Sequence, residues 1–363
     1  MKFKHLPDLF EESVRQFPDN VFMWEKRSAE YKGTTYTEAK QRMLHLASGF
    51  LELGLGKGDR VALISEGRND WVVSEMAMLY CAAISVPLSV KIEEPSDLKF
   101  RLSHSGCKGV VISGQHQHKI LNLANELPDL EFIMVLDDPD PESAFSLEKI
   151  QQGIKARILT INMVLENGQN AFKSNMTRIE EILANLSPND AANICYTSGT
   201  TADQKGIILT HLNYLANVEQ GSAIFDVPAY YTSLHILPWD HSFAHTVGIY
   251  ALMRNGASLA SLKIGKTLNE TLRNIPLCIK EVKPYFLLSV PALAKNFRNN
   301  IEKGVKDKGP IAWGLFRFGL KVAYAYNREG FNKGGGMRSF LKPLYSLFDA
   351  ILFKKVRQGF GGR

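Results

Sequence analysis

Short runs of apolar, often β-branched residues alternate along this chain with segments long enough to form a helix. The runs lie at residues 61–65, 86–90, 109–113 and 132–136 in a first series, and at 193–197, 206–209, 233–237, 257–262 and 285–289 in a second. Strands of parallel sheets are buried on both faces and carry such continuous runs, and helices connect them. The alternation therefore predicts an α/β protein built from two packed α/β sheets.

The length of the chain determines how many cores it can form. With 363 residues, of which 45% are hydrophobic and 22% are charged, it can bury more than one core and has the composition of an ordinary globular protein. We predict a first α/β lobe at approximately residues 60–185 and a second lobe formed by residues 1–59 and 186–363. The residues before Phe17 alternate charged and apolar positions, which predicts an amphipathic helix and not a signal peptide.

Charge and cysteine content exclude several classes of protein. The 43 basic and 37 acidic residues leave a net charge of +6, too small to indicate nucleic acid as a partner but compatible with small anionic ligands. No CxxC pair occurs, so neither a zinc cluster nor a disulfide framework is predicted, and a reducing cytoplasm suits the thiols. The four cysteines are Cys81, Cys107, Cys195 and Cys278.

Three further segments bear on the fold. The apolar run 72–90 contains Glu75 and Pro87, which predicts a buried helix followed by a strand and not a membrane span. Residues 165–178 are polar and predict a loop. The aromatic and basic residues of 313–326 recur at helical spacing, so this segment either contacts a membrane surface or packs one face on the core, the reading that we favour.

The segment that follows the run 193–197 is rich in hydroxyl side chains. Its backbone amides, hydroxyl groups and lysine are natural donors to phosphate oxygens, whereas the structural alternative is a threonine-rich turn. A Walker A loop is excluded, because Lys205 is flanked by Gln204 and Gly206. The segment therefore predicts a phosphate-binding loop. Its candidate residues are Thr197, Ser198, Gly199, Thr200, Thr201 and Lys205.

Residues 196–201, Lys205-Gly206 and Thr210-His211 together resemble the signature of the adenylate-forming (AMP-binding) superfamily. Other blocks, such as LPWDHSFAH at 237–245 and FKKVRQGFGGR at 353–363, are similar to the N-terminal portion of the long-chain fatty acyl-CoA synthetase branch. The resemblance implies an acyl-CoA synthetase-like N-terminal domain, incomplete at the C-terminus and without the C-terminal lobe.

The resemblance also implies roles for individual residues. The loop residues 197–201 would cradle the β- and γ-phosphates of ATP, Thr200 would in addition contact Mg2+, and Lys205 would hold the polyphosphate. His241 would lie beside the acyl carboxylate and the α-phosphate, where an imidazole can stabilise developing charge. Trp239 either lines the acyl pocket or packs in the core.

The implied activity is the ATP-dependent conversion of a fatty carboxylate to acyl-AMP and then to acyl-CoA, with ATP, Mg2+ and CoA required. We expect the 363-residue chain alone not to complete adenylation, since the family's adenine and ribose contacts and its catalytic lysine would lie beyond it. The expected location is the cytoplasm. Peripheral contact with the inner face of a membrane and a homodimer are left open, and no nucleic-acid partner is expected.

The sequence also allows two alternatives to this function. The acyl group could be passed to a carrier protein in place of CoA. The chain could also be a degenerate, non-catalytic homologue that binds an acyl group or a partner protein. The second alternative is motivated by Ala202 and Gln204, which stand where the family usually has glycine and proline, because alanine adopts some backbone angles less readily than glycine.

Overall fold

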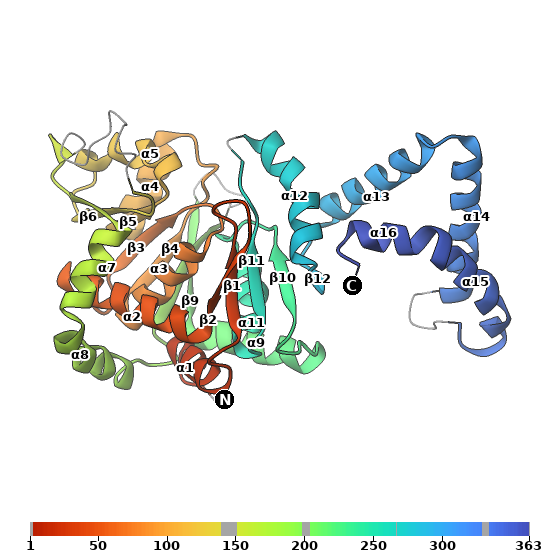
Figure 1. The fold of residues 1–363 in the computed structure, drawn as a ribbon. Coiled ribbons are helices and arrows are strands. Elements are labelled where there is room, and N and C mark those ends of the chain that lie inside the picture. The colour runs from red at the N-terminus through yellow and green to blue at the C-terminus, as the bar shows by residue number, and fades with distance from the viewer. Residues whose placement is uncertain (1–2, 139–150, 198–203, 266, 329–333, 363) are drawn as a thin grey trace. The chain divides into compact units, whose positions relative to one another are not determined.

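A computed structural model describes residues 3–138, 151–197, 204–265, 267–328 and 334–362 (Figure 1). The chain divides into two compact units, Met1–Ile264 and Gly265–Arg363. The first contains strands of two sheets with helices around them, so the predicted α/β class with two sheets is confirmed.

The larger sheet has seven strands in the order β7-β6-β5-β3-β4-β8-β9. Neighbouring strands are parallel from β7 to β8, and only the β8–β9 pair is antiparallel. The strands are β3 (Arg60–Ile64), β4 (Ile84–Pro87), β5 (Cys107–Ile112), β6 (Phe132–Val135), β7 (Arg157–Thr160), β8 (Ala191–Thr197) and β9 (Lys205–Thr210).

The membership of this sheet differs from the expected series at one point. The runs at 193–197 and 206–209, which we placed in the second series, form β8 and β9 of the larger sheet. The physical reason is the parallel pairing of β8 with β4, in which Asn193 lies opposite Ser85. An apolar run alone does not specify the strand with which it will pair.

The second sheet of the first unit runs β10-β11-β1-β2. β1 and β10 are both parallel to β11, and β2 is antiparallel to β1. Its strands are β1 (Val21–Glu25), β2 (Lys32–Thr35), β10 (Thr232–His235) and β11 (Ser258–Ser261). The apolar-run pattern predicted β10 and β11 but not β1 or β2.

The helices of the first unit surround these sheets. They are α1 (Leu6–Gln16), α2 (Tyr36–Glu52), α3 (Asn69–Tyr80), α4 (Pro95–Ser105), α5 (His118–Leu121), α7 (Ile161–Asn170), α8 (Phe172–Ala184), α9 (His211–Ile224), α10 (Ser242–His245) and α11 (Ala251–Arg254). All residues of α3 are buried, and the helix contacts strands of both sheets. The reading of 72–90 as a buried helix followed by a strand is therefore confirmed by α3 and β4.

The prediction of a loop at 165–178 is wrong, because α7 and α8 occupy it. α7 packs closely on α2 through two glycines. A Cβ atom added at Gly49 would lie 2.2 Å from the carbonyl oxygen of Val164, and one added at Gly168 would lie 1.8 Å from the carbonyl oxygen of His45. α7 buries Ile161 and Val164 together with Gly168 on one face, and the close contact at the glycines lets this mostly polar segment pack as a helix.

The second unit is mainly helical. Its elements are α12 (Leu268–Val282), β12 (Phe286–Leu287), α13 (Pro291–Lys306), α14 (Pro310–Asn327), a 3-10 turn at Gly336–Leu341, α15 (Lys342–Phe348), a π-helical turn at Asp349–Phe353 and α16 (Lys354–Gly359). α14 buries one face through Phe316, Gly319, Val322 and Tyr326, as the core-facing interpretation of 313–326 predicted. Among the residues that the structure describes, no helix is long and apolar enough to cross a bilayer.

Candidate active site

The predicted phosphate loop connects β8 to β9 in the sequence. Residues 198–203 are outside the described part of the chain, so the placement of Ser198, Gly199, Thr200 and Thr201, and with it the proposed magnesium contact of Thr200, stays a prediction. Thr197 and Lys205 are described. They form the last register pair of the hairpin and are both exposed, one on each side of the loop.

The base of this hairpin is fixed to α4. The Tyr196 hydroxyl donates to the backbone carbonyl of Arg101 at 3.1 Å, and the Arg101 guanidinium lies over the Tyr196 ring. On the other strand, the side-chain amide of Gln204 donates to Asp97, which also pairs with Arg101 at 3.3 Å. Gln204, one of the two departures from the family pattern, thus contributes a tertiary contact at the root of the loop.

The Thr210-His211 pair of the signature has a structural role here. Thr210 caps α9 in a capping box with Asn213. The buried His211 ring accepts a hydrogen bond through Nδ1 from the backbone amide of Leu6 at 3.3 Å. Burial lowers the pKa of His211 to about 3, with the neighbouring His5 adding to the effect, so this ring stays neutral and fixes α1 against the start of α9.

The predicted catalytic histidine lies at the N-terminus of the short helix α10. His241 is exposed, and its Nδ1 accepts a hydrogen bond from the backbone amide of Phe243 at 3.2 Å. Because Nδ1 is the acceptor, the neutral ring carries its proton on Nε2. The Nε2–H group is therefore the one that His241 can offer to a substrate oxygen.

A buried polar cluster lies behind His241. His245, at the other end of α10, donates from Nε2 to Oε1 of Glu75 at 2.9 Å, and Tyr250 donates to Oε2 at 2.9 Å. Asn193 of β8 donates to Oε1 at 3.2 Å. Burial raises the pKa of Tyr250 well above its usual value, and the adjacent Glu75 carboxyl adds to the shift, so the phenol remains a donor. Glu75 of α3 thus joins the strand of the phosphate hairpin to the helix that carries His241.

Trp239 is a core residue. Its side chain is 4% exposed and lies against Trp71 and His235, with ring centroids 5.7 and 4.9 Å apart. A Cβ atom at Gly67 would lie 2.1 Å from Nε1 of Trp239, so the loop after β3 can approach this ring only with glycine. The sequence left open whether Trp239 lines the acyl pocket or packs in the core, and the structure supports core packing.

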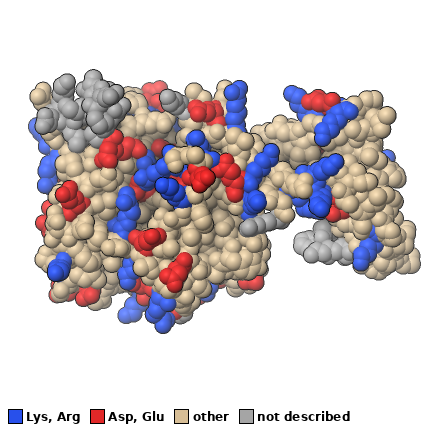
Figure 2. Space-filling view, in the orientation of Figure 1, with Lys and Arg blue, Asp and Glu red and all other residues tan. Residues whose placement is uncertain are grey.

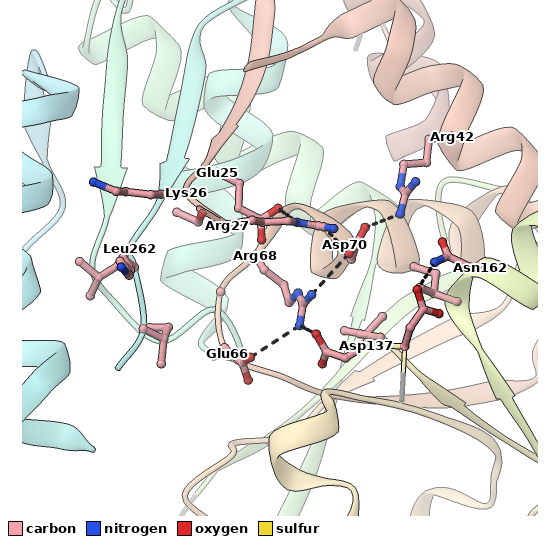
Figure 3. A pocket seen from close by; sticks show the side chains of 17 residues that line it. Glu25, Lys26, Arg27, Arg42, Glu66, Arg68, Asp70, Asp137, Asn162 and Leu262 are labelled. Atoms are coloured by element: carbon pink, nitrogen blue, oxygen red, sulfur yellow. Dashed lines mark hydrogen bonds and ion pairs between the residues drawn. The ribbon is translucent and has the colours of Figure 1, made fainter. Parts of the chain in front are cut away.

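A polar cavity of about 450 Å3 opens where β1, β3, β6 and β11 end (Figure 3). Carboxyl ends of parallel strands are where open α/β sheets bind ligands. Asp70, 1% exposed, accepts from Arg27 at 2.5 Å and from Arg42 at 2.8 Å. Arg68 pairs with Asp137 at 2.7 Å; burial alone would lower the pKa of Arg68, but Asp137 and Asp70 offset this and raise it.

The chemistry of this cavity is balanced in charge. Its lining includes five Lys or Arg and five Asp or Glu side chains, so it presents paired ions and not a net positive field. Glu75 and Asp70, the centres of the two buried networks, were both missed as candidate residues by reasoning from the sequence. A usable signal existed for Glu75, because a carboxyl in an apolar helical run must find buried donors.

Comparison with known proteins agrees with this architecture. The chain is 26% identical to a peroxisomal long chain acyl-CoA synthetase 7 of Arabidopsis thaliana, over 99% of this chain and 47% of that protein. It is 23% identical to the long-chain-fatty-acid–CoA ligase FadD15 of Mycobacterium tuberculosis, over 97% of this chain and 54% of that protein. The chain thus spans about half the length of these curated relatives.

A solved structure shares the fold. The adenylation domain of a carboxylate reductase from Mycobacterium chelonae superimposes with a TM-score of 0.71 at 16% identity, covering 92% of this chain and 53% of that one. The family model described as AMP-binding enzyme matches residues 10–341. The matched region contains the β8–β9 hairpin, α10 and the Glu75 cluster, and the chain therefore belongs to the AMP-binding enzyme family.

Proposed function

We propose that this chain provides the phosphate-binding and carboxylate-binding parts of an enzyme that activates a fatty carboxylate with ATP, forming acyl-AMP and then acyl-CoA. The long-chain acyl-CoA synthetases among its relatives support the fatty carboxylate and CoA. The family match and the threonine-rich segment support ATP and Mg2+ as part of this proposal. Because the chain spans about half the length of those relatives, we propose that turnover needs the longer protein, whereas nucleotide binding can be tested on the chain itself.

The observation that carries this proposal is the Glu75 carboxyl. Asn193, four residues before the Thr197 edge of the phosphate loop, and His245, one helical turn after His241, both donate to its Oε1 atom. A shared buried acceptor holds the loop strand and the histidine helix in one rigid body. In-line attack of a carboxylate on an α-phosphate requires the groups that bind the two reactants to be positioned in this way.

Replacing Lys205 by alanine is expected to weaken binding of Mg-ATP to the 363-residue chain by about tenfold or more, because a charge-assisted contact to phosphate is lost. Isothermal titration calorimetry measures the change directly. The matched control is Lys173→Ala, which removes another exposed lysine, on α8. If the wild-type chain binds no Mg-ATP, or if both variants weaken binding equally, the nucleotide site is not at this hairpin, and the degenerate, non-catalytic alternative gains support.

The proposed role of His241 toward the substrate can be tested separately from its role as the N-cap of α10. Asparagine can accept the Phe243 amide in the same way but has no group at the position of Nε2. In the full-length protein that carries this chain, His241→Asn is expected to lower the rate of acyl-AMP formation by about a hundredfold, the usual effect of losing one positioned donor. Pyrophosphate release with ATP and a series of fatty acids measures it. An unchanged rate would contradict the role, and His118→Asn, at an exposed histidine, is the control.

A further inference from the structure

We propose that Gln204 and Tyr196 are positioning residues of the phosphate site. They fasten one face of the β8–β9 strand pair to α4, and the opposite face then presents Thr197 and Lys205 to a polyphosphate. This inference rests on the proposed function, because it deepens the assignment of the phosphate site to these two strands. It is carried by the alternation of side chains along the strands, by the contacts of α4 and by the charge of the first unit.

Side chains alternate between the two faces of the β8–β9 pair, because successive residues of a strand point to opposite sides. Tyr196 and its register partner Gly206 share one face, which we call the rear face. A Cβ atom added at Gly206 would lie 3.4 Å from the Tyr196 ring, in agreement with this arrangement. Gln204, two residues before Gly206, belongs to the rear face as well. Thr197 and Lys205 form the next register pair on the opposite, front face, and both are exposed.

The rear face is fastened to one side of α4. Asp97, Arg101 and His104 recur at the spacing i, i+4, i+7, which places them on one line along the helix. Gln204 donates to Asp97, and the Tyr196 hydroxyl donates to the backbone carbonyl of Arg101 at 3.1 Å. The same hydroxyl lies 2.8 Å from Nδ1 of His104, and because its single hydrogen is already used, His104 is the donor of this bond. Both strands are thus tied to the same line of α4.

α4 can serve as a rigid support because it is itself fixed to the core. Leu98 and Leu102 of α4 are each 2% exposed and belong to a large cluster of buried apolar residues. At the end of the helix, Arg60 of β3 donates to the backbone carbonyl of Ser105 at 2.8 Å and to that of Gly106 at 2.7 Å. The rear face is therefore attached to a helix that the first unit holds in place at both its side and its end.

β9 has little else to hold its first residues. It is the outer strand of the larger sheet, and in the part of the chain that the structure describes it pairs with β8 alone. Ile207 and Ile208 are 43% and 61% exposed, so hydrophobic packing contributes little to its position. Among the described residues, Oε1 of Gln204 is buried without a hydrogen-bond partner. Because an unpaired buried acceptor is unfavourable for folding, stability alone does not account for glutamine at this position.

The charge of the first unit makes the placement of a few donors decisive. Its 264 residues contain 24 Lys and Arg against 31 Asp and Glu, a net charge of −7. Figure 2 shows basic and acidic side chains interspersed on the visible face of this unit, without a broad basic patch on that face. Such a unit does not attract a polyphosphate through its overall field. The affinity therefore depends on individual donors that are held in place before the ligand arrives.

The test is the binding of Mg-ATP to the 363-residue chain, measured by isothermal titration calorimetry. Gln204→Ala is expected to weaken binding about fivefold, because the strand that carries Lys205 loses a hydrogen bond to α4. Gln204→Glu is expected to weaken it about tenfold or more, since two carboxylates would then face each other. Combining Gln204→Glu with Asp97→Asn exchanges donor and acceptor at unchanged net charge. This pair is expected to restore the affinity to within about threefold of the wild-type value.

Hydrogen exchange of β8 and β9 without nucleotide, followed by mass spectrometry, gives a second readout. Exchange is expected to be about fivefold faster in Gln204→Ala and to return to the wild-type rate in the exchanged pair. The midpoint of urea unfolding is expected to stay unchanged, whereas a merely structural role would lower it. The matched control is Lys99→Ala, which removes the 2.6 Å ion pair of α4 with Glu126 and is expected to alter neither affinity nor exchange.

The outcomes separate this inference from the proposed function. If the wild-type chain does not bind Mg-ATP, the proposed function fails and this inference fails with it. If the chain binds Mg-ATP but Gln204→Ala changes neither affinity nor exchange, only this inference is overturned. The same holds if the exchanged pair binds as weakly as Gln204→Glu, because the added charge would then explain the loss. An equal loss in Lys99→Ala, or a urea midpoint that falls in step with the affinity, would also overturn it.

Discussion

Lowering the pH from about 7 to about 5 is expected to reduce the free energy of unfolding of the first unit by about 4 kcal/mol through two buried histidines, His211 and His235. Burial lowers the pKa of each to about 3; the neighbouring His5 adds to the shift of His211, and His245 adds to that of His235. Neither ring can take up a proton in the folded chain until the pH is far below the value at which it does so when unfolded.

The direction of the effect follows from proton linkage. Between the unfolded pKa of 6.5 and the folded pKa of about 3, the unfolded chain binds protons at these two positions and the folded chain does not. Stability is therefore complete above pH 6.5 and falls with the pH below it, by about 1.4 kcal/mol per unit for each histidine. Between pH 6.5 and about pH 5 the contributions of the two histidines add up to a loss of about 4 kcal/mol in the free energy of unfolding.

Urea unfolding at a series of pH values, followed by tryptophan fluorescence, measures this slope. His211→Asn retains an acceptor for the Leu6 amide but cannot be protonated, so it is expected to remove about half of the slope. The control is His118→Asn, at an exposed histidine, which should leave the slope unchanged. If His211→Asn leaves the slope unchanged, the His211 ring takes up its proton at the same pH in the folded and the unfolded chain, which would contradict the prediction.

The fold was predictable where burial leaves a local pattern. β3, β5, β6, β8 and β11 lie within one or two residues of the apolar runs, because strands buried on both faces are apolar throughout. β2, with the sequence KGTT, is largely polar at the edge of its sheet, so no run marks it. α7 was missed because the segment 165–178 is mostly polar, although Ile161, Val164 and Gly168 lie buried on one face of the helix at helical spacing.

The candidate site was predictable only in part. Thr197, Lys205 and His241 could be chosen because they belong to short segments with a family resemblance. Glu75 could not be chosen in that way, because its donors Asn193 and His245 lie 118 and 170 positions further along the chain. Asp70 likewise meets Arg27 and Arg42 only through the packing of α3 against β1 and α2. Contacts between distant segments require the tertiary structure.

The Glu75 network gives the second large effect. Glu75→Gln is expected to lower the free energy of unfolding by about 3 kcal/mol, because a buried carboxyl with several donors is replaced by an amide. In the wild-type chain His245 and Asn193 donate to Oε1 of Glu75, and Tyr250 donates to Oε2. The amide has one acceptor oxygen, and its NH2 group must face at least one of these donors. At least one buried donor therefore loses its partner without access to water.

Urea unfolding at neutral pH measures this loss, with Glu180→Gln at an exposed position of α8 as the matched control, expected to change stability by less than about 0.5 kcal/mol. A double-mutant cycle with His245→Gln tests the contact itself, and a coupling energy of about 1 kcal/mol or more is expected for groups that share a buried hydrogen bond. Additive effects of the two substitutions would contradict the network. If the coupling is present, α10 is held to α3 by this contact, and any disturbance of Glu75 must also reach His241, one helical turn away on α10.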